Sequence, residues 1–85
     1  MINTMDELIE HMHNEEIKRI RQDKEISGAY GVIKYWFNEL KSERSARYYN
    51  ELYGMTYVLE ATYYISSKEA DNLRKEFEEL MKEAL

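Results

Sequence analysis

The sequence ISSKEADNLRKEFEELMKEAL, residues 65–85, contains the clearest helix signal in the chain. Ser66 and Glu69 have the spacing of a capping box, in which the hydroxyl and the carboxylate each bind a backbone N–H that the first helical turn leaves free. Ile65 and Ala70 are placed as the accompanying hydrophobic staple. The apolar positions alternate steps of three and four, as antiparallel bundles prefer, and are Ala70, Leu73, Phe77, Leu80 and Ala84. This stretch predicts an amphipathic helix packed on a neighbouring helix.

Two further helices are predicted upstream. Thr4 and Glu7 form a second capping box and begin a first helix, whose apolar stripe rotates beyond Asn14. At that point either a kink or a new helix capped by Asn14 is expected. The dipeptide at residues 27–28, Ser-Gly, predicts a helix stop, and the apolar spacing predicts another helix over about residues 29–41.

A tyrosine-rich helix completes the expected fold. It begins after a cap at Ser42 or Ser45 and is expected to run to about Ile65. Proline is absent, and apolar residues follow helical spacing almost throughout. The predicted fold is all-α: a single helical domain over residues 1–85, built as a small four- (or five-) helix bundle with a C-terminal antiparallel helical hairpin. The residues expected to be buried together are Trp36, Leu52, Leu59, Leu73 and Phe77.

Composition narrows the class of protein. An 85-residue chain with 44% hydrophobic and 34% charged residues fits one folded domain and not a disordered chain. The absence of cysteine excludes disulfides and thiolate metal sites, and it fits a reducing compartment. No apolar run is long enough to span a bilayer, and the acidic start MINTMDELIE is unlike a signal peptide. We therefore expect a cytoplasmic protein that has no membrane partner.

The tyrosine-rich helix has two apolar stripes. Residues 46–66 hold six of the eight tyrosines in the chain. One stripe suffices to face the core, so the second stripe is either buried too or forms a contact surface with another protein or a second copy. Tyr53 and Tyr57 are expected at the centre of such a contact, most simply in a homodimer. The predicted protein-binding residues are those of the second stripe: Tyr49, Tyr53, Tyr57 and Tyr64.

No pattern in the sequence points to catalysis. His11 and His13 lie two residues apart, on different sides of a helix, so they cannot share a metal ion there. The serines fit turns and caps, and the glycines do not form a phosphate-binding loop. We expect no enzyme activity, no cofactor, no metal site and no small-molecule substrate.

Nucleic-acid binding is the alternative function. Although the net charge is −5, residues 17–47 carry eight bases against four acids. The segment IKRIRQDKEIS, residues 17–27, resembles the opening helix of phage-repressor-type helix-turn-helix domains. The residues that follow lack the glycine turn and the polar recognition helix of that family, and they place Trp36 and Phe37 where base contacts need polar groups. The candidate nucleic-acid-binding residues are Lys18, Arg21, Lys34, Lys41, Arg44 and Arg47.

These patterns favour a small acidic helical protein-interaction module. In size and charge it is similar to inhibitors encoded by mobile elements, such as anti-CRISPR or DNA-mimic proteins, and this is an analogy of class alone. The two functions differ in their salt dependence. Nucleic-acid binding must weaken as salt rises, whereas an aromatic protein contact should persist.

Overall fold

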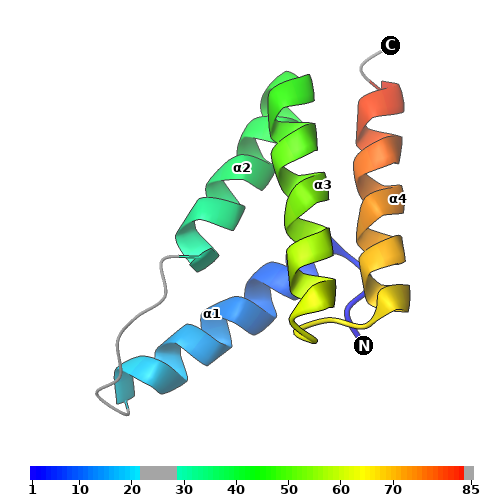
Figure 1. The fold of residues 1–85 in the computed structure, drawn as a ribbon. Helices are drawn as coiled ribbons and strands as arrows, with labels where there is room; N and C mark the ends of the chain where they lie inside the picture. Colours follow the sequence, from blue (N-terminus) through cyan, green and yellow to red (C-terminus); the bar gives the residue numbers. More distant parts are fainter. Residues whose placement is uncertain (22–28, 84–85) are drawn as a thin grey trace.

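The computed structural model describes residues 1–21 and 29–83, and these residues form four α-helices without a strand. The helices are α1 (Met5–Arg21), α2 (Ala29–Glu43), α3 (Ala46–Ala61) and α4 (Ser67–Glu83). α2, α3 and α4 form a row with α3 in the middle, and α1 crosses one end of this row (Figure 1). The all-α class and the helical bundle are confirmed. α1 continues through Asn14, so the alternative break into five helices is not seen there.

In the described part of the chain, no helix is both long and apolar enough to cross a membrane. The predicted stop at residues 27–28 and the last stripe position, Ala84, lie outside the described residues.

α4 begins as its sequence predicts. The Ser66 hydroxyl accepts a hydrogen bond from the Glu69 backbone N–H at 3.1 Å, and the Glu69 carboxylate accepts one from the Ser66 N–H at 2.9 Å. The other oxygen of Glu69 accepts a bond from the Ile2 N–H at 2.6 Å. One carboxylate therefore caps α4 and also holds the N-terminal segment against it.

A second acidic residue of α4, Glu76, binds the start of α1. Glu76 accepts a hydrogen bond from the backbone N–H of Met5 at 2.8 Å, and the Asn72 amide donates to the Asn3 side chain at 2.8 Å. These groups lie on one face of α4 together with Glu69, at spacings of three, four and seven residues. The N-terminal segment is thereby fixed to the C-terminal helix.

α3 is shorter than its sequence predicts. It ends at Ala61 and not near Ile65, because Tyr63 adopts a left-handed conformation with φ 62°. The Tyr63 N–H then donates to the Glu60 carbonyl at 3.1 Å, and the Tyr64 N–H donates to the Leu59 carbonyl at 2.9 Å. This pair of bonds is a Schellman motif, and it satisfies carbonyls that the helix end leaves free. Tyr63 and Tyr64 therefore belong to the α3–α4 connection and not to the helix.

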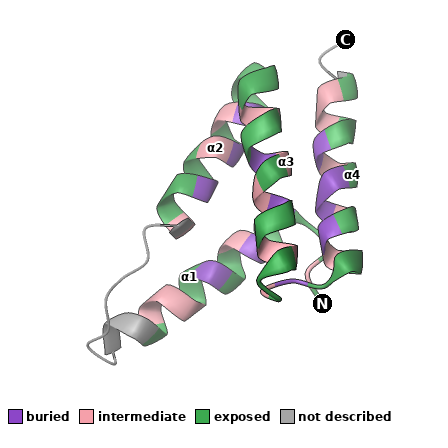
Figure 2. Cartoon of the chain, viewed as in Figure 1, coloured by how far each residue is buried: buried purple, intermediate pink, exposed green. Residues whose placement is uncertain are grey.

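The core lies where the four helices meet (Figure 2). Leu52, Leu73 and Phe77 are fully buried, as predicted, whereas Leu59 and Trp36 are half-buried at its edge. The ring of Phe77 meets that of Phe37 edge to face, with centroids 6.5 Å apart. The buried apolar residues of the described chain are Met5, Leu8, Met12, Ile33, Phe37, Leu40, Leu52, Ile65, Ala70, Leu73 and Phe77.

Candidate protein-interaction site

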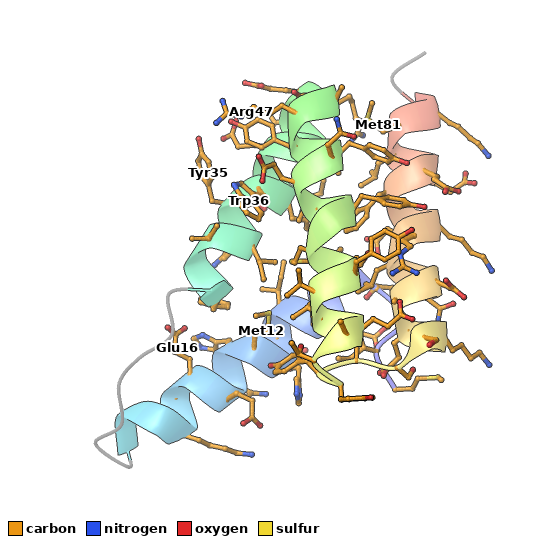
Figure 3. All side chains as sticks on the ribbon, in the orientation of Figure 1. Met12, Glu16, Tyr35, Trp36, Arg47 and Met81 are labelled. Carbon is orange, nitrogen blue, oxygen red and sulfur yellow. The ribbon has the colours of Figure 1, made fainter. Side chains whose placement is uncertain are left out.

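Three tyrosines form a continuous ladder along α3. The ring centroids of Tyr49 and Tyr53 lie 5.4 Å apart, and those of Tyr53 and Tyr57 lie 5.8 Å apart. Their spacing of four residues places them on one side of the helix, and this side faces α4. Tyr49 lines the same hollow as Met81 of α4, and Figure 3 labels Met81. This tyrosine ladder, Tyr49, Tyr53 and Tyr57, lies along the contact between α3 and α4.

Arg74 of α4 holds the part of the ladder that contains Tyr57. Its guanidinium donates hydrogen bonds to Thr56 at 2.9 Å, to Glu60 at 2.7 Å and to Asp71 at 3.1 Å. It also lies 3.9 Å from the ring centroid of Tyr57, within cation–π distance. Arg74 is buried, yet every nitrogen of its planar head has a partner. The charge is therefore compensated, and the guanidinium has a fixed orientation.

The electrostatics agree with this arrangement. The hydrogen bond from Arg74, followed by one from Ser67, lowers the pKa of the Glu60 carboxyl. Burial opposes the charge of Arg74, but the hydrogen bond to Glu60 and the nearby acids outweigh it and raise the Arg74 pKa. Burial is also the main cause that raises the pKa of the Tyr53 hydroxyl. At neutral pH the site thus combines the Arg74–Glu60 ion pair with the neutral phenol of Tyr53.

Tyr57 is the exposed member of the ladder. It is 55% exposed, whereas Tyr49 and Tyr53 are half-buried. Its ring borders a hollow of about 500 Å³ whose wall includes Glu60, Tyr63 and Arg74. Tyr57 therefore presents an aromatic surface whose position is set from beneath by Arg74.

The outer face of α3 lies beside Tyr57. We use this name for the exposed residues of α3 that point away from the core: Arg47, Asn50, Glu51, Gly54, Val58 and Ala61. Between this face and α2 runs an apolar groove of about 630 Å³. Trp36, labelled in Figure 3, lines this groove together with Val32, Ile33, Gly54, Met55 and Val58, and the polar residues Asn50 and Glu51 complete its wall. The C-terminal half of the outer face carries no charge.

The fourth predicted contact residue lies elsewhere. Tyr64 is half-buried in the α3–α4 connection, and its ring meets that of His11 on α1 at 5.6 Å. The structure thus brings together Tyr49, Tyr53 and Tyr57 but not Tyr64. The assignment of Tyr64 to one helical stripe assumed that α3 continues to residue 65, and the helix ends before it.

The predicted basic residues do not form one surface. Lys18 is on α1 and pairs with Glu15 at 3.4 Å, and the side chain of Arg21 lies outside the described part. Lys34 donates a hydrogen bond to the Tyr30 hydroxyl at 3.4 Å. The remaining bases, each on or beside the α2–α3 turn, are Lys41, Arg44 and Arg47.

The two histidines make ring contacts. His11 meets Tyr64, and the ring of His13 lies 5.0 Å from that of Tyr30. Within residues 1–21 and 29–83 no group of three or more His, Cys, Asp or Glu side chains could hold a metal ion.

Arg74 is the site residue that the sequence analysis missed. A signal for it exists, because Arg74 follows Ala70 by four residues and precedes Phe77 by three, which places it on the buried face of α4. A long basic residue on an apolar stripe indicates a partner on the facing helix. Comparison with protein-family models, with curated proteins and with solved structures finds no match for the chain.

Proposed function

We propose that this chain is a small protein-interaction module that binds its partner through Tyr57 and the adjoining outer face of α3. The observation that carries the proposal is the contact between Tyr57 and Arg74. The Tyr57 ring is more than half exposed, yet the guanidinium 3.9 Å beneath it is held by hydrogen bonds. An exposed aromatic side chain in a fixed position is typical of a binding anchor.

The fixed position of the ring favours binding energetically. A side chain that is free in solution loses rotamer entropy when a partner immobilises it. The Tyr57 ring lies against Arg74 and contacts the tilted ring of Tyr53 before any partner arrives, so this loss is reduced. Its exposed area and its hydroxyl remain available to the partner.

The charges beside Tyr57 are largely balanced within the chain. Glu60 and Asp71 lie next to the ladder, and both pair with Arg74, at 2.7 and 3.1 Å. The site therefore does not require a partner surface of one charge sign, and Tyr57 supplies most of the affinity.

Nucleic-acid binding remains the alternative proposal. Lys41, Arg44 and Arg47 lie within seven residues of one another around the α2–α3 turn. Arg44 is half-buried, and Lys41 and Arg47 lie over the rings of Phe37 and Tyr48. A phosphate contact here would be electrostatic and would weaken steeply with salt.

The test is co-purification with a tagged chain from host cells that also make the untagged chain. Tyr57→Ala should lower recovery of the bound protein at least tenfold, in low and in high salt. The matched control is Tyr35→Ala, because Tyr35 is 54% exposed against 55% for Tyr57 but lies on α2. Equal recovery with the two variants, or the absence of any bound protein, would reject the proposal. Recovery of nucleic acid that salt abolishes would favour the alternative.

Arg74→Lys tests the positioning role of Arg74. Lysine keeps the charge but lacks the planar head that stacks on Tyr57 and bonds to three acceptors. Binding should weaken while circular dichroism still reports a helical protein. Unchanged binding by a folded Arg74→Lys variant would show that the stack does not prepare Tyr57 for its partner.

A further inference from the structure

Gly54 has no structural reason within the chain to be glycine. It lies in the middle of α3, where glycine is the least favourable residue other than proline. None of the described glycines has a positive φ, so the backbone conformation does not require it. Beyond its chain neighbours and the backbone of its own helix, a Cβ atom built on Gly54 would meet no described atom within 4 Å. Neither backbone strain nor internal packing therefore accounts for this residue.

The residues around Gly54 indicate why this position is a glycine. Gly54 forms part of the wall of the apolar groove between α2 and α3, next to Met55 and Val58. Val58 is 61% exposed and Val32, across the groove, is also exposed. Glycine on an exposed helix face allows the backbone of another helix to approach closely, as small residues do at helix crossings.

We infer that the outer face of α3 binds a second copy of this chain, with the two α3 helices crossing beside Gly54. This inference rests on the proposed protein-binding role of that face and names the partner. In a twofold dimer, a glycine at the crossing point acts twice, since each copy brings its own. The exposed valines of one copy then fill the groove of the other.

Charge favours a second copy at this face. The chain has a net charge of −5, so two copies repel each other wherever acids dominate their facing surfaces. The outer face of α3 carries only Arg47 and Glu51, which have opposite signs. Two such faces can therefore meet without net repulsion.

The outer face of α3 is open to a second copy. A stable interface buries roughly 800 Å² on each partner, a small part of the 5647 Å² that this chain exposes. α2, α3 and α4 stand in one row, and no described helix covers α3 on its outer side (Figure 1).

An antiparallel crossing gives the Tyr57 hydroxyl a partner. Asn50 lies about one turn before Gly54 on α3, and Tyr57 lies about one turn after it on the same edge of the face. A twofold axis beside Gly54 therefore sets Asn50 of each copy against Tyr57 of the other. The hydroxyl can then donate a hydrogen bond to the Asn50 side-chain oxygen.

Sedimentation velocity of the full chain over a wide concentration range tests the inference. The parent should form dimers, and Gly54→Gln should raise the dimer dissociation constant at least tenfold because a long side chain blocks the crossing. Gly31→Gln is the matched control, since Gly31 is also an exposed helical glycine with nothing within 4 Å of a built Cβ. Both variants gain helix propensity, so neither should unfold, and circular dichroism checks this.

Two results would overturn the inference. A parent that is monomeric at every concentration excludes the second copy as the partner. Equal dissociation constants for the two glycine variants would place the dimer on another surface. If the monomeric parent still binds a different protein through Tyr57, only this inference fails and the proposed function stands.

Discussion

The guanidinium of Arg74 lies 3.9 Å from the ring centroid of Tyr57, on the side of the ring that faces α4. The same guanidinium joins α4 to α3 through Thr56 and Glu60, at 2.9 and 2.7 Å. One buried residue thus serves two purposes. It closes the contact between the two helices, and it sets the position of the aromatic ring that we propose as the binding anchor.

Arg74→Lys should lower the free energy of unfolding by about 1–3 kcal/mol, because acceptors inside the α3–α4 contact lose their donor. Lys75→Ala is the control: Lys75 is exposed on the next position of α4, and its loss should change stability by no more than about 0.5 kcal/mol. Urea unfolding followed by circular dichroism gives both values. Similar midpoints for the two variants would mean that the hydrogen bonds of Arg74 contribute little.

Tyr63→Gly should stabilise the protein by about 0.5–1 kcal/mol. Tyr63 has φ 62°, a conformation in which a side chain is strained and glycine is not. The Tyr63 side chain is 93% exposed, so its removal sacrifices almost no packing. Thermal unfolding should therefore show a higher midpoint.

Ala61→Gly is the matched control for Tyr63→Gly. Ala61 is the last residue of the same helix and does not have a positive φ. Glycine at position 61 should lower the free energy of unfolding by about 0.5–1 kcal/mol, because it only adds backbone freedom to the unfolded chain. If both substitutions lower the midpoint, the left-handed turn at Tyr63 stores no strain.

The helix starts were predictable because their signals are local. The capping boxes at Thr4 and Ser66 need only a hydroxyl and a carboxylate three residues apart. The Ser66 box forms with both of its bonds. At Thr4 the hydroxyl accepts the Glu7 N–H at 3.3 Å, and the Glu7 carboxylate accepts from the Thr4 hydroxyl instead of the Thr4 N–H. Ser45, one of the two proposed caps of α3, accepts the Arg47 N–H at 3.2 Å. Such interactions are decided within one turn of the chain and do not depend on the rest of the fold.

The end of α3 was not predictable in the same way. Helices usually end at a glycine in the left-handed conformation, and residues 61–66 contain none. α2 ends similarly, with Arg44 at φ 52°. In both places tertiary packing selects a conformation that the local sequence disfavours.

The candidate site was predictable only in part. Helical spacing identified the ladder of Tyr49, Tyr53 and Tyr57, since residues four apart share a helix face. The sequence left open whether this face is buried, and the structure places most of it against α4 and leaves Tyr57 exposed. That outcome depends on Arg74, which lies 17 residues from Tyr57 in the sequence, a contact that no local pattern encodes.

Phe77→Ala should lower the free energy of unfolding by about 3–5 kcal/mol. Phe77 is fully buried and meets Phe37 across the core, so alanine leaves a cavity that this small domain cannot fill. Leu80 lies on the same stripe but is half-buried, so Leu80→Ala should lower the free energy of unfolding clearly less. Urea unfolding of the two variants makes the comparison, and a loss at position 80 that equals the loss at position 77 would place the centre of the core elsewhere.

Glu76→Gln should raise the thermal midpoint at pH 7 and have little effect in acid. Burial raises the pKa of the Glu76 carboxyl, and the nearby acids Asp6 and Glu7 add to this, against the hydrogen bond from the Met5 N–H. The folded state therefore holds the Glu76 proton to higher pH than the unfolded chain does. It follows that the parent loses stability as pH rises through this raised pKa.

Glutamine keeps an oxygen for the Met5 N–H and carries no charge at any pH, so Glu76→Gln should not show that loss. Its advantage should shrink as pH falls and should vanish below about pH 4, where the carboxyl of the parent is protonated in both states. Glu79→Gln is the control, because Glu79 is exposed on the same helix and pairs with the exposed Lys82 across 3.4 Å. Thermal unfolding from pH 3 to pH 7 gives all three curves. A midpoint for Glu76→Gln below that of the parent at pH 7 would show that the start of α1 needs the negative charge more than burial opposes it.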